Sequence, residues 1–425
     1  WTAYRNIATN EKSRYMFNVG LSYKITDWMN LAGRYRMDDT HVQFERKVYA
    51  TSDQKFAEGK KGLYDYSNYK DRQEYADFML NINKQFNDFN ISANLGYSYS
   101  NYWSLARGYK GTLLGVTNLF AASNIDPSNG RISEDGGDSR VRNHAIFANV
   151  ELGWRSMLYL TLTGRNDWNS RLVNTSEESF FYPSVGLSWI LNKTLDLPGW
   201  ISFGKVRASW AQVGNDLPIG ITDLSDIIGA GGKLQAVDVY NRGDLKPEIS
   251  NSIEFGLEWR LFNSRVDFDF TYYKTDTKNQ LLKVPTSAGE DYAYRYINAG
   301  KIRNKGFEIT LGATPVLTED FRWKTTFNYS QNRNKVVELA PNYTSFVYGD
   351  PGFSMAYMMQ IKEGGSLGDI YGNTFARDEQ GKIKVSDEGK PISESGNKTY
   401  LGNCNPDFLL SWANTFTYKG FSLYF

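Results

Sequence analysis

Residues 252–273, SIEFGLEWRLFNSRVDFDFTYY, decide the fold because their side chains alternate between apolar and polar almost without error. Before Asn263-Ser264 the apolar set is Ile253, Phe255, Leu257, Trp259 and Leu261, and the polar set is Glu254, Gly256, Glu258 and Arg260. After it, Val266, Phe268, Phe270 and Tyr272 alternate with Asp267, Asp269 and Thr271. Since successive strand residues point to opposite faces, the stretch predicts a β-hairpin with one apolar and one polar face.

The same alternation recurs along the chain and predicts about fourteen strands in seven hairpins. The expected strand pairs cover residues 15–25 and 29–37, 76–82 and 89–97, 146–154 and 158–162, 185–189 and 206–210, 253–261 and 266–272, 307–311 and 321–329, and 408–416 and 421–425. The protein is therefore expected to be all-β and antiparallel.

The connections between these strands fall into two classes. Links within a hairpin are short, apart from residues 192–200, whereas the links between hairpins are long. The long links are expected at residues 39–73, 104–141, 171–180, 214–249, 276–303 and 334–405. Short turns on one side and long loops on the other are typical of an outer-membrane barrel, with short periplasmic turns and long extracellular loops.

Composition narrows the class of protein. The formal net charge is +1, which gives no reason to expect nucleic acid as a partner. One cysteine, Cys404, excludes an internal disulfide, and no stretch approaches the roughly 20 apolar residues of a membrane helix. The chain begins at Trp1 and stops within an expected strand, so we expect it to be a piece of a longer protein.

A soluble β-sandwich would show the same alternation, with its apolar face against a second sheet. Two features favour the membrane instead: the loop asymmetry, and Trp and Tyr near the strand ends, where an interfacial girdle would lie. These aromatic residues are Tyr97, Trp154, Trp189, Trp210, Tyr329, Trp412 and Tyr418. We therefore expect a transmembrane antiparallel up-and-down β-barrel whose apolar face meets lipid and whose polar face lines the lumen.

Several stretches resemble the SusC/RagA family of TonB-dependent outer-membrane transporters of Bacteroidetes. The most specific is NRGDLKPEISNSIEFGLEWRLFNSRVDFDFTYYKTDTKNQL, residues 241–281, with its DLKPE entry and YKTDTKNQL exit. VRNHAIFANVELGWRSMLYLTLTGRNDWNSRL, PSVGLSWIL with KVRASWAQVGN, YINAGKIRNKGFEITLGATPV and EGGSLGDIYGNTF follow the same order as in the family.

The resemblance implies a barrel of about 22 strands whose lumen is plugged by an N-terminal domain. Residues 1–425 would then be part of a single barrel domain, an open arc without the plug or the C-terminal barrel strands. It also implies import of oligosaccharides or peptides, a SusD-like surface lipoprotein as a lid, and energy delivered by TonB through the plug segment. This portion alone is not expected to transport.

Enzymatic activity is not expected. His144 shares the apolar parity of Ile146 and Val150, which suits a girdle residue better than a catalytic base, and His41 has no recognisable nucleophile and orienting carboxylate. No cofactor or metal is expected. The acidic stretches at 378–382 and 386–390 lack the fixed ligand spacing of a calcium loop and predict two hairpin turns around a strand at 382–385.

Substrate contacts, if present, are expected from loop aromatics, whose rings stack on sugars or peptide groups. The candidates are Tyr64, Tyr66, Tyr69, Trp103, Phe120, Tyr292, Tyr294, Tyr296, Tyr343 and Tyr348, and packing within the loops is the competing interpretation for each. The arginines expected to face the lumen are Arg34, Arg36, Arg155, Arg165, Arg207 and Arg322. We expect them to pair with carboxylates such as Glu151, Glu254 and Glu258, or to hold the plug, and not to bind cargo.

Import is the leading functional hypothesis. The alternatives are a glycan-binding outer-membrane or soluble β protein without transport activity, and a barrel-embedded hydrolase. An outward apolar band without a covering sheet would favour import. A histidine, a carboxylate and a nucleophile meeting in the lumen would favour the hydrolase.

Overall fold

The structure is a computed structural model that describes residues 6–52, 59–128, 131–133, 138–175, 177–218, 221–222, 227–228, 234–235, 239–240, 245–286, 294–340, 343–348 and 357–425. Within these residues, no helix is long and apolar enough to cross a membrane.

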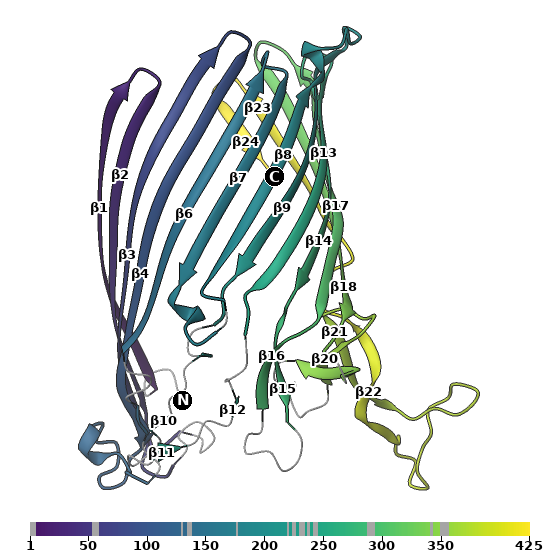
Figure 1. The fold of residues 1–425 in the computed structure, drawn as a ribbon. Coiled ribbons are helices and arrows are strands. Elements are labelled where there is room, and N and C mark those ends of the chain that lie inside the picture. The colour runs from purple at the N-terminus through teal and green to yellow at the C-terminus, as the bar shows by residue number, and fades with distance from the viewer. Residues whose placement is uncertain are drawn as a thin grey trace.

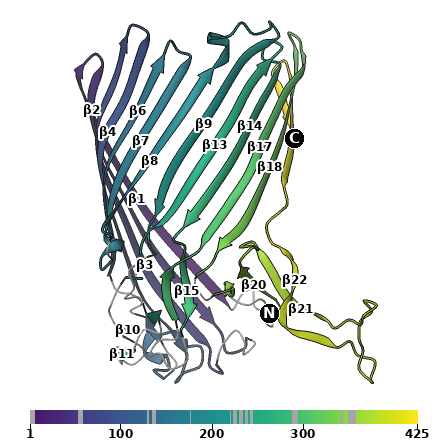
Figure 2. The same cartoon turned by 45° about the vertical axis from the view of Figure 1, so that its right-hand side comes forward.

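One large curved sheet dominates the described residues (Figures 1 and 2). Fourteen strands follow one another through it in chain order, all antiparallel, and the short β5 (Arg131–Ser133) pairs with one of them, β4. In order they are β1 (Ile7–Thr26), β2 (Met29–Val48), β3 (Leu63–Phe86), β4 (Phe89–Thr112), β6 (Asp138–Trp154), β7 (Leu158–Asn169), β8 (Ser179–Ile190), β9 (Ile201–Asn215), β13 (Glu248–Leu261), β14 (Val266–Lys278), β17 (Lys301–Leu317), β18 (Phe321–Glu338), β23 (Leu409–Tyr418) and β24 (Phe421–Tyr424). The expected fourteen-stranded up-and-down sheet is confirmed.

The short turns gather at one end of the sheet and the long connections at the other (Figure 1). Residues of the short turns adopt the positive φ that tight hairpins need, such as Asn87 at 45°, Arg155 at 51° and Lys419 at 50°. The turn expected at Asn263-Ser264 also includes Phe262, at φ 54°, whose ring stacks on Trp200 at 5.8 Å.

Several strands are longer than the alternation indicated. β2 continues to Val48, β3 begins at Leu63 and β4 runs to Thr112, so much of the expected loops at 39–73 and 104–141 is strand. The sequence hid this because polar residues occupy both parities there, while the backbone ladder between β2 and β3 continues in register without a break. These strands rise well beyond the apolar band.

The two faces of the sheet differ as the alternation predicted. Apolar side chains on one face are open, with Phe78 61%, Ile253 56% and Trp412 66% exposed. No second sheet lies over that face in the part of the chain that the structure describes (Figures 1 and 2). We call it the apolar face, and the opposite one, which carries the fully buried Asp77, the polar face.

The long connections contain small sheets of their own. β10 (Ile227–Ile228) pairs with β11 (Leu234–Gln235), and β12 (Val239–Tyr240) and β15 (Leu281–Pro285) flank β16 (Tyr294–Asn298). β19 (Ser345–Tyr348), β20 (Tyr357–Lys362), β21 (Asp369–Phe375) and β22 (Ser393–Asn403) form a third. Three 3-10 turns cover Ala122–Asn124, Ser170–Leu172 and Leu191–Lys193. Two of the apolar clusters lie here, Leu172 with Leu217, Ile221 and Leu245, and Val336 with Leu339 and Ile361.

Candidate functional site

The polar face carries a series of arginine–aspartate pairs, some between neighbouring strands and some within one strand. Arg34 Nε donates to both carboxylate oxygens of Asp77 at 3.1 Å, and the Asp77 side chain is fully buried. Arg165 pairs with Asp167 at 2.8 Å. The expectation that lumen arginines pair with carboxylates is confirmed for Arg34 and Arg165, but the partners are aspartates of the same face and not Glu151, Glu254 or Glu258. No carboxylate pairs with Arg322 among the described residues.

Two further arginines, Arg36 and Arg155, have carboxylate partners other than those expected. Arg36 lies 3.7 Å from Asp38, within its own strand. Arg155 belongs to the turn between β6 and β7, where its Nε donates at 2.9 Å to Asp88 of the neighbouring turn. Its parity in the sequence suggested the lumen wall, but the positive φ of the turn directs it to the next hairpin.

The predicted aromatic residues Tyr64, Tyr66, Tyr69 and Trp103 lie on strands β3 and β4, not in loops. Their placement in loops was wrong because the strands continue beyond the apolar band. Their role in substrate binding stays a prediction.

The structure brings Tyr64, Tyr66 and Phe120 together at the loop end of the sheet. Tyr66 stacks on Tyr109 at 5.2 Å, and Tyr64 lies 5.6 Å from Tyr109 and 5.9 Å from Phe120. Tyr49 completes the group, 4.9 Å from Phe120. Tyr49 and Tyr109 were not among the predicted residues. Tyr109 could have been found, because antiparallel pairing of β3 with β4 in the expected hairpin register sets it opposite Tyr66.

Tyr64 has a structural role in this group. Its ring is 6% exposed, and its hydroxyl donates to Glu45 Oε1 at 2.8 Å. Burial, and then the bond to Glu45, raise the pKa of Tyr64 above its usual value. Lys47 and the Tyr64 hydroxyl lower the pKa of Glu45. Tyr64 therefore fits the packing interpretation better than direct substrate contact.

Tyr69 is placed differently, on the polar face. It shares the parity of Asp77 in the unbroken pairing of β3 with β2 and β4, and it is 41% exposed. Tyr75 and Tyr102 share that face, and Tyr102 donates to Asp71 Oδ1 at 3.0 Å. These two were not predicted because substrate-binding aromatic residues were expected in loops, although their parity is opposite to that of Phe78 and Leu95.

The remaining candidates lie on several elements, with Tyr294 and Tyr296 both on β16. Tyr294 on β16 is 42% exposed, with Lys283 Nζ 4.5 Å from its ring centre, whereas Tyr296 packs against the Leu172 cluster. Tyr343 follows β18 and Tyr348 ends β19. Trp103 has the parity of Tyr97, on the apolar face, and Tyr292 lies outside the described residues.

The two histidines are held in polar contacts on strands. His144 Nδ1 lies 2.6 Å from the Tyr97 hydroxyl on the exposed apolar face, as a girdle residue would. His41 Nε2 lies 2.8 Å from Asn68 Oδ1, on β2 and not in a loop. The two acidic turns are confirmed, because Gly381 and Gly389 donate backbone hydrogen bonds to Asp378 and Ser386. The strand expected at 382–385 is not found, since Ile383 and Val385 form only single bridges, to Arg377 and Pro391.

A profile of the family described as "TonB dependent receptor-like, beta-barrel" matches residues 1–387. TonB-dependent receptor P3 of Formosa agariphila is 24% identical over 99% of this chain and 44% of its own length. TonB-dependent receptor SusC of Bacteroides thetaiotaomicron is 25% identical over 66% of this chain and 30% of its own length.

The solved structure of the RagAB peptide transporter shares the fold. It superposes with a TM-score of 0.79 at 17% identity, covering 99% of this chain and 48% of the matched one. The chain thus spans less than half the length of these relatives.

Proposed function

The chain belongs to the TonB-dependent receptor-like β-barrel family, and on that premise we propose that it forms part of the wall of an outer-membrane active transporter for nutrients. Its SusC/RagA resemblance and its outer-membrane location are confirmed by the same comparisons. The family consists of transporters and receptors, not enzymes. We also propose that residues 1–425 are part of one barrel domain, since the chain spans less than half the length of its relatives.

The observation that carries the proposal is the difference between the two faces. Exposed apolar side chains such as Ile253 suit lipid, which offers no hydrogen bonds, whereas arginine–aspartate pairs such as Arg34 with Asp77 suit a polar lumen. A glycan-binding soluble sheet would have no need of an uncovered apolar face. The polar face therefore lines the route of the cargo.

The cargo is an oligosaccharide or a peptide. Tyr69 offers an exposed ring on the polar face, near the loop end of the sheet where cargo would enter. Aromatic rings stack on sugar C–H groups and on peptide planes, so this surface fits either class. The relative in the RagAB structure is a peptide transporter, which supports the peptide option.

Two partners complete the transporter. By resemblance to SusC/RagA, a SusD-like surface lipoprotein closes over the loop end. TonB, acting on the plug segment, supplies the energy. The arc of strands alone would neither take up substrate nor transport it.

Deleting the full-length gene in its host tests the proposal. The mutant should fail to grow on one class of oligosaccharide or peptide, and plasmid-borne wild-type protein should restore growth. In a strain without TonB activity, the protein should still bind labelled substrate at the cell surface but should no longer import it.

The alternative, a glycan-binding protein without transport activity, predicts another result. Growth and import would then not depend on TonB, and deletion would reduce only the substrate retained at the cell surface. That outcome would overturn the transport proposal.

A further inference from the structure

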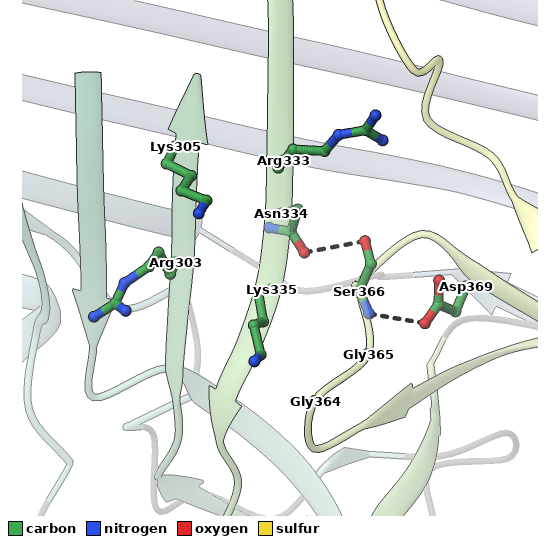
Figure 3. A pocket seen from close by; sticks show the side chains of 9 residues that line it. All are labelled: Arg303, Lys305, Arg333, Asn334, Lys335, Gly364, Gly365, Ser366 and Asp369. Carbon is green, nitrogen blue, oxygen red and sulfur yellow. Dashed lines mark hydrogen bonds between the residues drawn. The ribbon is translucent and has the colours of Figure 1, made fainter. Parts of the chain in front are cut away.

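Four cationic side chains gather around one cavity on β17 and β18. Arg303 and Lys305 of β17 and Arg333 and Lys335 of β18 line a space of about 500 Å³ together with residues 364–366. Figure 3 shows the four side chains on two adjacent strands, with the 364–366 segment beside them. The segment is held there because Ser366 Oγ donates to Asn334 Oδ1 at 3.2 Å and Gly364 N–H to Val336 O at 2.9 Å.

The strand register places these cations on the apolar face. Arg303 lies opposite Lys335 and Lys305 opposite Arg333, and the ladder continues without a shift to Phe307, Ile309 and Leu311. Lys305 therefore has the same parity as Phe307, two residues away, or about 7 Å along a strand. The cavity opens on the face that meets lipid, not on the lumen.

An aromatic row borders the cavity on that face. Phe307 stacks on Tyr329 at 5.5 Å, and Tyr329 stacks on Phe408 at 5.6 Å. Rows of this kind mark the level of the membrane interface. The cations stand directly beyond the row on the loop side, at the height of the headgroups of the outer leaflet.

Carboxylates neutralise only part of this charge. Asp276 accepts from Arg303 at 2.6 and 3.0 Å and also lies 3.5 Å from Lys301 and 4.0 Å from Lys274.

The other two carboxylates near the cavity are also engaged. Arg333 pairs with Asp407, and Asp369 accepts from Ser366 N–H and Asn403 Nδ2, both at 2.8 Å. No salt bridge of Lys305 or Lys335 occurs among the described residues. Their ammonium groups can bind an anion.

We propose that this cavity binds the phosphate of an outer-leaflet glycolipid, whose acyl chains lie along Phe307 and Tyr329. Lysine binds phosphate as a compact point charge, and arginine binds it through the planar set of N–H donors of its guanidinium group. Basic pockets beside a membrane-spanning surface bind phosphorylated headgroups in the same way. Cargo in the lumen faces the opposite side of the sheet, so the site is separate from import and rests only on the membrane location.

The test uses the full-length protein in detergent, with monophosphoryl lipid A, the same glycolipid without phosphate, and inorganic phosphate as probes. The phosphorylated glycolipid should bind best, and added salt should weaken it. The double variant Lys305→Gln/Lys335→Gln should bind it about thirtyfold more weakly, since each lysine near a headgroup contributes about 1 kcal/mol and the two together contribute about 2 kcal/mol. Lys382→Gln/Lys384→Gln, in the distant exposed hairpin, should bind as wild type.

Three outcomes would overturn the proposal. In the first, the Lys305/Lys335 variant keeps its thermal unfolding midpoint and binds the phosphorylated glycolipid as tightly as wild type does. In the second, the dephosphorylated glycolipid binds as tightly as the phosphorylated one. In the third, inorganic phosphate binds as tightly as the lipid. The last would make the cavity a site for free anions. If the first double variant does not fold, Lys335→Gln alone replaces it.

Discussion

The guanidinium of Arg207 on β9 crosses the whole width of β13 and binds the carboxylate of Asp269 on β14, with Nη1 and Nη2 donating at 3.0 and 2.9 Å. It passes over Gly256, where an added Cβ would lie 2.4 Å from Arg207 Nε. Thr271 accepts a third bond at 2.6 Å. The glycine in the polar parity of the hairpin thus leaves room for a cross-strand pair on the lumen side.

Gly256→Val should therefore destabilise the full-length protein by about 1–3 kcal/mol, because the new side chain forces Arg207 away from Asp269. Urea unfolding in lipid vesicles measures this. Gly186→Ala is the matched control, since its Cβ would meet Ser209 and Thr161 only at ordinary contact distances of 3.8 and 3.9 Å. Equal stability of both variants would show that the crossing by Arg207 does not matter.

Leu257→Arg should cost roughly 2–4 kcal/mol if Leu257 lies near the bilayer midplane, because it places a charge against lipid. Leu257 lies beside Phe270 and Val206 on the apolar face. Glu258→Gln, one residue away on the polar face, should change stability little. The same unfolding measurement compares them, and equal tolerance would contradict the assignment of the two faces.

Tyr69→Ala should lower import of the cognate oligosaccharide or peptide several-fold without changing the amount of folded protein in the membrane. Its ring is exposed on the polar face, so its loss removes stacking on the cargo. Initial uptake of labelled substrate in complemented cells measures the effect. Tyr64→Phe serves as the control, because Tyr64 is buried in the aromatic group; unchanged uptake by Tyr69→Ala would exclude Tyr69 from the route.

Tyr64 should also make stability depend on alkaline pH. Its pKa is raised in the folded protein, so the stabilisation that depends on its proton is complete below the ordinary value of 10.0 and is lost as pH rises through the folded pKa. At neutral pH, Tyr64→Phe should be less stable by about 1 kcal/mol, the usual contribution of one hydrogen bond. The difference from wild type should shrink above about pH 10.

Unfolding of both proteins across pH 8–11 checks this. Because the other titrating groups are common to the two proteins, their effects cancel in the difference. A difference that stays constant over this range would show that the proton of Tyr64 does not contribute.

The local alternation of apolar and polar side chains was sufficient to predict the strands of the large sheet. Each expected alternating stretch coincides with one of the fourteen strands, apart from Phe408 and Phe425, which fall one residue outside β23 and β24, since a half-exposed strand imposes a period of two on its own residues. It was insufficient for the loop ends, where β3 extends to Leu63 through residues that are polar on both faces. There the neighbouring strand, and not the side-chain pattern, maintains the backbone pairing.

The candidate site was predicted only in part for a related reason. Residue type singled out Tyr64 and Tyr69 alike, yet one is buried against Phe120 and the other is exposed on the polar face. Tyr75 and Tyr102 were missed because their importance depends on the face they share with Tyr69.

The strands, the tight turns and the division into an apolar and a polar face could be predicted from the sequence, because each depends on residues close together in the chain. Which groups meet across the sheet depends on the tertiary structure. Arg207 and Asp269 are 62 residues apart, and the basic cavity joins two strands to a segment around Ser366. Strand register and sheet curvature set those contacts, and both depend on all the neighbouring strands at once.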